Sequence, residues 1–195
     1  MWTPGDTVAS HGNLALRYMR DEEAEYRLLS RWLTDERVLE WIYGRDNPWP
    51  YDRVLAKYRP RVLGEHPVRS CFIVLEGEPL GYIQFFPVAD AASYGLEDAA
   101  GYWGVDMWIG EPDIWSQGLG TRALRALLGH LFAVEGAVVA VIDPRVENPR
   151  AVRCYEKAGF RCVKVLPGHE LHEGSWRDSW LMVATPGDLP DFPAP

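Results

Sequence analysis

The stretch from Tyr102 to Phe160 constrains the fold most, because its apolar pattern alternates between the period of a strand and that of a helix. "YWGVDMWIG" (102–110) and "AVVAVID" (137–143) are strand-like, and the second is continuously apolar, as in a strand buried on both faces. A glycine-containing turn and a helical pattern lie between them, and a second helix follows. A strand–helix–strand unit of this kind indicates an α/β sheet.

The remaining segments predict antiparallel strands and short helices around this unit. The other predicted strands are residues 14–19, 70–76, 80–88, 161–167 and 176–184. Helical patterns cover residues 21–33, a short segment capped at Thr34, and residues 54–63, which Pro60 should kink or shorten. We expect a mixed central β-sheet with helices on both faces, of the α/β (α+β) class, in a single domain of residues 1–185. The Pro-rich residues 186–195 predict a disordered tail.

Composition excludes several classes of protein. The net charge of −8 argues against a nucleic-acid partner and is compatible with a cationic substrate. No apolar run approaches the roughly 20 residues of a membrane span, and the N-terminus has no signal-peptide pattern, so we expect a soluble, cytoplasmic protein without a membrane partner. Cys71, Cys154 and Cys162 form no C-x-x-C pair, which indicates neither a disulfide framework nor a metal site.

The segment "WSQGLGTRAL" (115–124) stands where a strand leads through glycines into a helix. Backbone N–H groups and the positive end of the helix dipole make such a turn an anion site. Gly118 and Gly120 leave the backbone accessible, and Arg122 and Arg125 are candidates for charge at its rim. The spacing fits neither a P-loop nor a dinucleotide fingerprint. Taken alone, the segment is equally compatible with a plain helix-start turn.

A second motif, "NPRAVRCYEKAGF" (148–160), decides between these interpretations. With the glycine turn before it, it resembles the GNAT superfamily of acetyl-CoA-dependent N-acetyltransferases. The matching residues are Gly118 and Gly120 of the turn and Asn148, Ala151, Tyr155, Lys157, Gly159 and Phe160 of the second motif. Trp115 departs from the family pattern, which has Gln or Arg at that position.

The resemblance implies that acetyl-CoA is the co-substrate and that no metal takes part. The pyrophosphate would lie on the backbone of the glycine turn, and the pantetheine would run beside the strand of residues 102–110 like an added strand. The residues expected to contact coenzyme A are Met107, Trp108, Ile109, Gln117, Gly118, Leu119, Gly120, Thr121 and Asn148. Capping of its own helix explains Asn148 equally well.

Shorter stretches, among them "LEWIYG" (39–44) and "GVDMWIG" (104–110), are similar to the aminoglycoside 6′-N-acetyltransferases. The implied reaction transfers acetyl to an aminoglycoside amine, the 6′-amine being the expected one, and the implied assembly is a monomer or homodimer. A protein N-terminus or a polyamine is an alternative acceptor. A catalytically silent acyl-CoA-binding module is the alternative outside the enzymes.

N-acetylation needs a carboxylate to take a proton from the amine and an acid to protonate the leaving thiolate. Asp106, in the middle of a strand that should be buried, is the candidate base or amine anchor, against a solvent-facing strand carboxylate. Tyr155 matches the position from which the family protonates the thiolate, against simple core packing. Asp143, at the carboxyl end of its strand, either faces the aminoglycoside or is a turn residue before Pro144.

The loop of residues 89–101 suggests an acidic and aromatic rim for a polyamine sugar, since carboxylates pair with ammonium groups and rings stack on sugars. Glu97, Asp98 and Trp103 are its candidate substrate residues; a solvated loop is the alternative. By resemblance alone, Trp41, Tyr58 and Gln84 join them. None of the histidines is assigned to catalysis.

Overall fold

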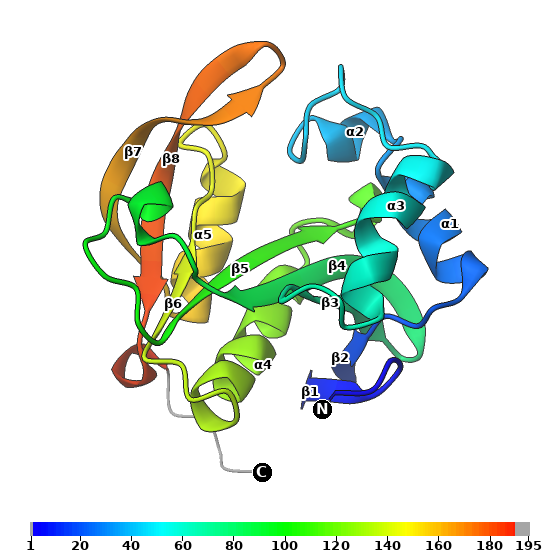
Figure 1. Cartoon of the computed structure of the whole chain (residues 1–195), viewed down its shortest axis with the longest axis horizontal. Coiled ribbons are helices and arrows are strands. Elements are labelled where there is room, and N and C mark those ends of the chain that lie inside the picture. The colour runs from blue at the N-terminus through cyan, green and yellow to red at the C-terminus, as the bar shows by residue number, and fades with distance from the viewer. Residues whose placement is uncertain (1, 190–195) are drawn as a thin grey trace.

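The computed structural model describes residues 2–189, which form one eight-stranded sheet with helices against both faces (Figure 1). The strands are β1 (Thr7–His11), β2 (Leu14–Tyr18), β3 (Arg69–Leu75), β4 (Glu78–Pro87), β5 (Tyr102–Ile109), β6 (Val139–Ile142), β7 (Arg161–His172) and β8 (Ser175–Ala184). The helices are α1 (Glu23–Trp32), α2 (Glu36–Leu39), α3 (Tyr51–Val62), α4 (Leu119–Ala133) and α5 (Pro149–Ala158). The strand order is β1-β2-β3-β4-β5-β6-β8-β7, and among these pairs only β5 and β6 are parallel. The predicted mixed α/β sheet is confirmed.

Alternation along β5 assigns its side chains to two different apolar layers. Trp103, Val105 and Met107 belong to the layer between the sheet and α4. Trp108 belongs to the layer on the opposite face, where α1 and α3 pack. Asp106 shares the face of Trp108 by this alternation, so it cannot point into the core under α4.

The sheet splits between β5 and β6, and this split creates the space for a ligand. The two strands pair only from Tyr102 to Gly104 on β5, opposite Val139 to Val141 on β6. β6 ends at Ile142, whereas β5 continues to Ile109 and pairs there with β4 alone. The β6-facing backbone edge of β5 beyond Gly104 is therefore left without a neighbouring strand.

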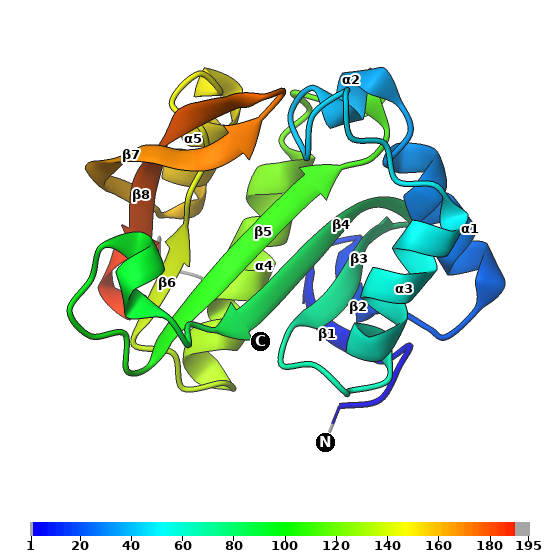
Figure 2. The same ribbon diagram turned by 45° about the horizontal axis from the view of Figure 1, so that its top comes forward.

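The long β7–β8 hairpin reaches across this split to the loop after α2 (Figure 2). The Arg45 guanidinium contacts the Glu173 carboxylate at the hairpin tip through Nε at 2.6 Å and Nη2 at 2.9 Å. Arg145, before α5, donates from Nη2 to the Glu40 carbonyl at 2.7 Å. Segments more than a hundred residues apart are thereby joined into one wall.

The structure differs from the predicted elements in small ways. β1 was not predicted from the sequence, because this short edge strand lacks a clear apolar alternation. The cap of α2 is Asp35, whose carboxylate accepts from the Arg37 N–H, one residue after the predicted Thr34. α3 runs from Tyr51 to Val62 with Pro60 inside it, so Pro60 does not shorten the helix appreciably: it ends only one residue before the end of the predicted pattern.

The beginning of the predicted tail is ordered. Residues 186–188 form a short 3₁₀-helix, in which Thr185 and Asp188 make a reciprocal capping box. The rest of the predicted tail, residues 190–195, lies outside the described residues. Within residues 2–189, none of the helices combines the length and apolar character needed to cross a membrane.

Candidate active site

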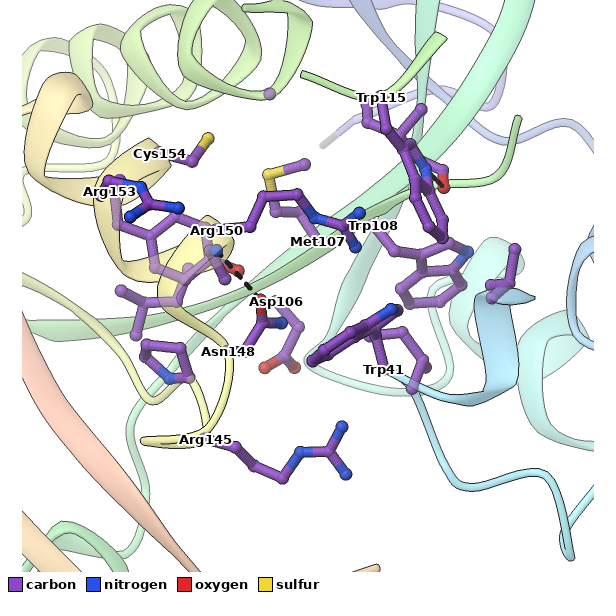
Figure 3. Close-up of a pocket in the computed structure, with 18 of the residues that line it drawn as sticks. Trp41, Asp106, Met107, Trp108, Trp115, Arg145, Asn148, Arg150, Arg153 and Cys154 are labelled. Carbon is purple, nitrogen blue, oxygen red and sulfur yellow. Dashed lines mark hydrogen bonds between the residues drawn. The ribbon is translucent and has the colours of Figure 1, made fainter. Parts of the chain in front are cut away.

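A cleft of about 660 Å³ opens where β5 and β6 diverge. Its walls come from the end of α2 and the loop after it, β5, the turn before α4, the end of β6, α5 and β7 (Figure 3). The cleft thus collects residues that lie between positions 38 and 170 of the chain. Among the described residues, no cluster of His, Cys, Asp or Glu side chains has the arrangement of a metal site.

The turn before α4 presents a row of unpaired backbone donors. No hydrogen bond within residues 2–189 is made by the N–H groups of residues 116–121, and the first paired one is Arg122 N–H, which donates to the Gly118 carbonyl at 3.1 Å. Ser116 and Gly118 have φ values of 64° and 80°, so the turn folds into a left-handed conformation that exposes successive N–H groups. Together with the helix dipole these donors form an anion cradle.

The two glycines of the turn serve different purposes. Gly118 holds the left-handed φ, and a Cβ there would meet nothing within 4 Å, so its role is conformational. Gly120 allows α5 to approach, since a Cβ there would lie 3.0 Å from Cys154 Sγ. The motif glycines therefore both shape the cradle and bring α5 beside it.

The cations at the cradle are not those predicted. Arg122 donates to the His11 carbonyl at 2.9 Å, and Arg125 donates to the Lys157 carbonyl at 2.7 Å, so both hold neighbouring elements instead of lining the cleft. Arg150, Arg153 and Lys157 of α5 line it instead. Their spacing of three and four residues places them on one helix face, a signal that was present in the second motif.

The structure places most predicted coenzyme A contacts around the cleft. Eight of these residues line it: Met107, Trp108, Ile109, Gly118, Leu119, Gly120, Thr121 and Asn148. Gln117 is exposed and does not line the cleft, which leaves its N–H group as its contribution to the cradle. The Asn148 side chain accepts from the Ala151 N–H at 3.1 Å and so caps α5, with its amide N–H₂ still available to a ligand.

Asp106 is a half-buried carboxyl in the cleft, held by an ordered chain of polar groups. Gln84 Nε2 donates to Asp106 Oδ2 at 2.5 Å, and Gln84 Oε1 accepts from Tyr82 and Arg61 at 2.8 and 2.7 Å. Burial, followed by the charge of Asp143, raises the pKa of Asp106 to about 6. A carboxylate with this pKa is ionised at neutral pH yet basic enough to accept a proton.

Asp143 and His169 form a pair that sequence reasoning missed. Their Oδ2 and Nε2 atoms lie 2.8 Å apart, and this hydrogen bond raises the pKa of His169. Glu170, the next residue of β7, also lines the cleft, and burial raises the pKa of its carboxyl. The interpretation of Asp143 as a mere turn residue is wrong, because its side chain lies in the cleft.

Tyr155 projects from α5 into the cleft and is only 9% exposed. Burial raises the pKa of its hydroxyl well above the usual value, so the group keeps its proton at neutral pH. A buried, protonated hydroxyl and the Asp106 carboxylate thus line the same cleft, an arrangement that can serve as an acid–base pair.

Four predicted substrate residues lie away from the cleft, and their prediction as acceptor contacts is not supported by the structure. Tyr58 is fully buried beneath Tyr43, to whose hydroxyl its own oxygen lies 3.2 Å away. Trp103 occupies the α4 side of β5, opposite to Asp106, because their positions differ by an odd number of residues. Glu97 and Asp98 line a separate hollow at the other end of β5. Trp41, Gln84 and Asp143 do line the cleft.

Comparisons with known proteins agree with this geometry. A family model described as an acetyltransferase (GNAT) domain matches residues 21–167. An aminoglycoside N(6′)-acetyltransferase type 1 from Klebsiella pneumoniae is 33% identical over 153 residues, which are 77% of this chain and 75% of that protein.

Solved structures of acetyltransferases share the fold of this chain. The aminoglycoside acetyltransferase AAC(6′)-Ib in complex with coenzyme A and kanamycin is 29% identical, with a TM-score of 0.72 over 90% of this chain and 96% of that one. A spermidine N-acetyltransferase from Vibrio cholerae shares the fold at 15% identity, with a TM-score of 0.74 over 91% of this chain and 98% of that one. The chain belongs to the GNAT family of acetyltransferases.

Proposed function

We propose that this protein transfers the acetyl group of acetyl-CoA to an amine of an aminoglycoside, the 6′-amine, and thereby confers resistance. The observation that carries the proposal is the cleft itself, which joins an anion cradle at the start of α4 to the carboxylates Asp106, Asp143 and Glu170. An anionic donor and a polycationic acceptor can thus meet in one space. The names of the Klebsiella pneumoniae relative and of the kanamycin complex support the same acceptor class.

Acetyl-CoA, the acetyl donor, binds where β5 and β6 diverge. Its pyrophosphate binds the N–H groups of residues 116–121, where the helix dipole and the unpaired donors favour a negative group. Its pantetheine lies along the free edge of β5, beside Met107 to Ile109, and pairs with backbone groups that β6 does not reach. The thioester is thereby delivered next to Asp106.

The acceptor amine attacks the thioester carbon, so that an N–C bond forms and the C–S bond breaks. Asp106 takes the proton of the ammonium group, directly or through water, and Gln84 keeps the carboxylate oriented. Tyr155 gives its proton to the departing thiolate of coenzyme A. After the attack the nitrogen gives up its second proton, which restores the Tyr155 hydroxyl, and the proton taken by Asp106 returns to solvent. The products are the amide, free coenzyme A and one proton.

The acceptor side of the cleft suits a cationic sugar. Asp143 and Glu170 pair with ammonium groups, and Trp41 offers an aromatic face. The net charge of −8 favours the approach of a polycation. We infer that the enzyme acts in the cytoplasm, where acetyl-CoA is available. We also infer that it is a monomer or homodimer, and light scattering on purified protein measures this oligomeric state.

A thiol-release assay tests the proposed acceptor. Purified protein with acetyl-CoA should release coenzyme A thiol with kanamycin, but not with a matched aminoglycoside that carries a 6′-hydroxyl in place of the 6′-amine. Equal release with both compounds would contradict the regiochemistry. Release with spermidine or a peptide amine, but with no aminoglycoside, would replace the proposed acceptor while leaving the acetyl-transfer chemistry intact.

A further inference from the structure

Trp115 stands where the family pattern has Gln or Arg, and the structure shows what this tryptophan holds. Its indole Nε1 donates to the Ile109 carbonyl at 2.9 Å, and its ring packs against the apolar layer of α1 and α3. The Arg150 guanidinium lies over the ring, with Cζ 4.0 Å from the centroid. The Trp41 ring approaches the same guanidinium at 5.2 Å, so two indoles contact one cation (Figure 3).

The Arg150 guanidinium has no acceptor of its own. No hydrogen bond or ion pair joins it to any residue between 2 and 189, although the side chain is half-buried and burial lowers its pKa. A guanidinium carries five N–H donors in its plane, and indoles that contact its faces leave these edge donors free. The charge of Glu40 acts on this guanidinium but forms no ion pair with it, so the group is held in place with its edge donors free.

Arg150 and the cradle line the same cleft. α4 and α5 run side by side, since Thr121 Oγ1 lies 3.2 Å from the Cys154 carbonyl and Arg125 contacts the carbonyl of Lys157. Arg150 lies one helical turn before Cys154 and so flanks the open, N-terminal end of α4. A helix N-terminus and a guanidinium are both positive, and this arrangement is favourable only when an anion lies between them.

We propose that Arg150 binds the pyrophosphate of coenzyme A and that Trp115, with Trp41, is the positioning residue that holds this guanidinium at the cradle. The polar side chain, Gln or Arg, that the family pattern has ahead of the glycines is here replaced by a guanidinium from α5, and the tryptophan at that position holds this guanidinium in place. The inference rests on the acetyl-CoA part of the proposed function. It is independent of the acceptor.

Binding of three ligands to Arg150→Gln tests the assignment. Isothermal titration should show 10- to 100-fold weaker binding of both coenzyme A and 3′-dephospho-coenzyme A, as expected for loss of a charge-assisted contact. Pantetheine, which lacks the pyrophosphate, should bind equally to variant and wild type in ligand-detected NMR. Arg122→Gln is the matched control, because Arg122 bonds to β1 and its loop and should leave all three affinities unchanged.

Two results would overturn the assignment. Weaker binding of coenzyme A with unchanged 3′-dephospho-coenzyme A would place the guanidinium on the 3′-phosphate. Unchanged binding of both would leave Arg150 without a role in the donor site. Either result leaves acetyl transfer to aminoglycosides standing, since the titrations contain no acceptor.

A double-mutant cycle tests the role of Trp115. Trp115→Leu should weaken coenzyme A binding about as much as Arg150→Gln, and the double variant should be no weaker than either. Trp115→Phe, which keeps an aromatic face, should recover most of the affinity. If the double variant instead lost affinity for coenzyme A by the product of the two single losses, and all variants melted close to the wild-type temperature, Trp115 would not act through Arg150.

Discussion

The substitution Asp106→Asn tests whether Asp106 is the catalytic base. A catalytic carboxylate predicts that the variant loses activity without losing stability, whereas a purely structural carboxylate predicts that it loses stability and keeps its rate. Asparagine has nearly the same shape and its Oδ1 can still accept from Gln84, but it cannot take a proton. Loss of a general base typically costs about 10²- to 10⁴-fold in rate. We expect kcat/KM for the aminoglycoside to fall within that range while the affinity for coenzyme A stays unchanged.

The same substitution should stabilise the folded protein at neutral pH. The pKa of Asp106 rises from 3.8 to about 6 on folding, and at roughly 1.4 kcal/mol per pKa unit this is a cost of up to about 3 kcal/mol once the group is ionised. Because the folded state holds this proton more tightly than the unfolded state, the Asp106 carboxyl costs no stability below about pH 4. The cost to the free energy of unfolding grows as pH rises and is complete above about pH 6. The variant should therefore gain about 1–3 kcal/mol over wild type at pH 8 and little at pH 4, measured by urea denaturation.

The pH profile gives a third measurement. Wild-type kcat/KM should fall about tenfold per pH unit below pH 6, as Asp106 becomes protonated, and this limb should be absent from Asp106→Asn. Asp98→Asn is the matched control, since Asp98 lies outside the cleft and should leave rate and profile unchanged. If Asp106→Asn kept its rate within about threefold of wild type, the assignment of the base would be refuted.

Three further predictions concern single residues of the cleft. Tyr155→Phe should lower kcat at least about tenfold with unchanged coenzyme A affinity, and an unchanged kcat in a stopped-flow thiol assay would mean that the thiolate leaves unaided. His169→Gln should make the acceptor KM less dependent on pH. In wild type, the hydrogen bond to Asp143 raises the pKa of His169, so that as pH falls His169 takes up a proton, neutralises Asp143 and raises this KM; identical KM–pH profiles of variant and wild type would contradict this. Gly118→Ala should cost about 1–2 kcal/mol of stability, since a left-handed φ of 80° is strained for alanine, and should weaken coenzyme A binding; titration and thermal melting measure both.

The donor half of the site was predictable from sequence because it is made of local backbone. A strand, a glycine turn and a helix within about twenty residues create the unpaired N–H groups, and no distant residue is needed to form them. The cap of α5 by Asn148 and its end at Gly159 are equally local. Such features depend on spacing, which a single sequence displays in full.

The acceptor half depends on contacts between distant segments, and there the sequence was less informative. Trp103 was misassigned because alternation turns it to the α4 side of β5, and Glu97 and Asp98 because the loop before β5 lies at the far end of that strand. His169 reaches Asp143 only because the β7–β8 hairpin is long enough to pass beside β6. No spacing in the sequence encodes that distance.

By itself, the sequence determined the mixed sheet and a candidate anion-binding turn, since these follow from short-range periodicity and backbone geometry. Coenzyme A as the donor followed from the resemblance of the two motifs to the GNAT superfamily. Tertiary structure alone brought the Arg150 guanidinium over Trp115 and His169 beside Asp143, whereas Asp106 was a candidate from the sequence that the fold places in the cleft. The physical reason is that a cradle of N–H groups is built by consecutive residues, whereas a pocket of side chains is built by strands and helices that meet only after folding.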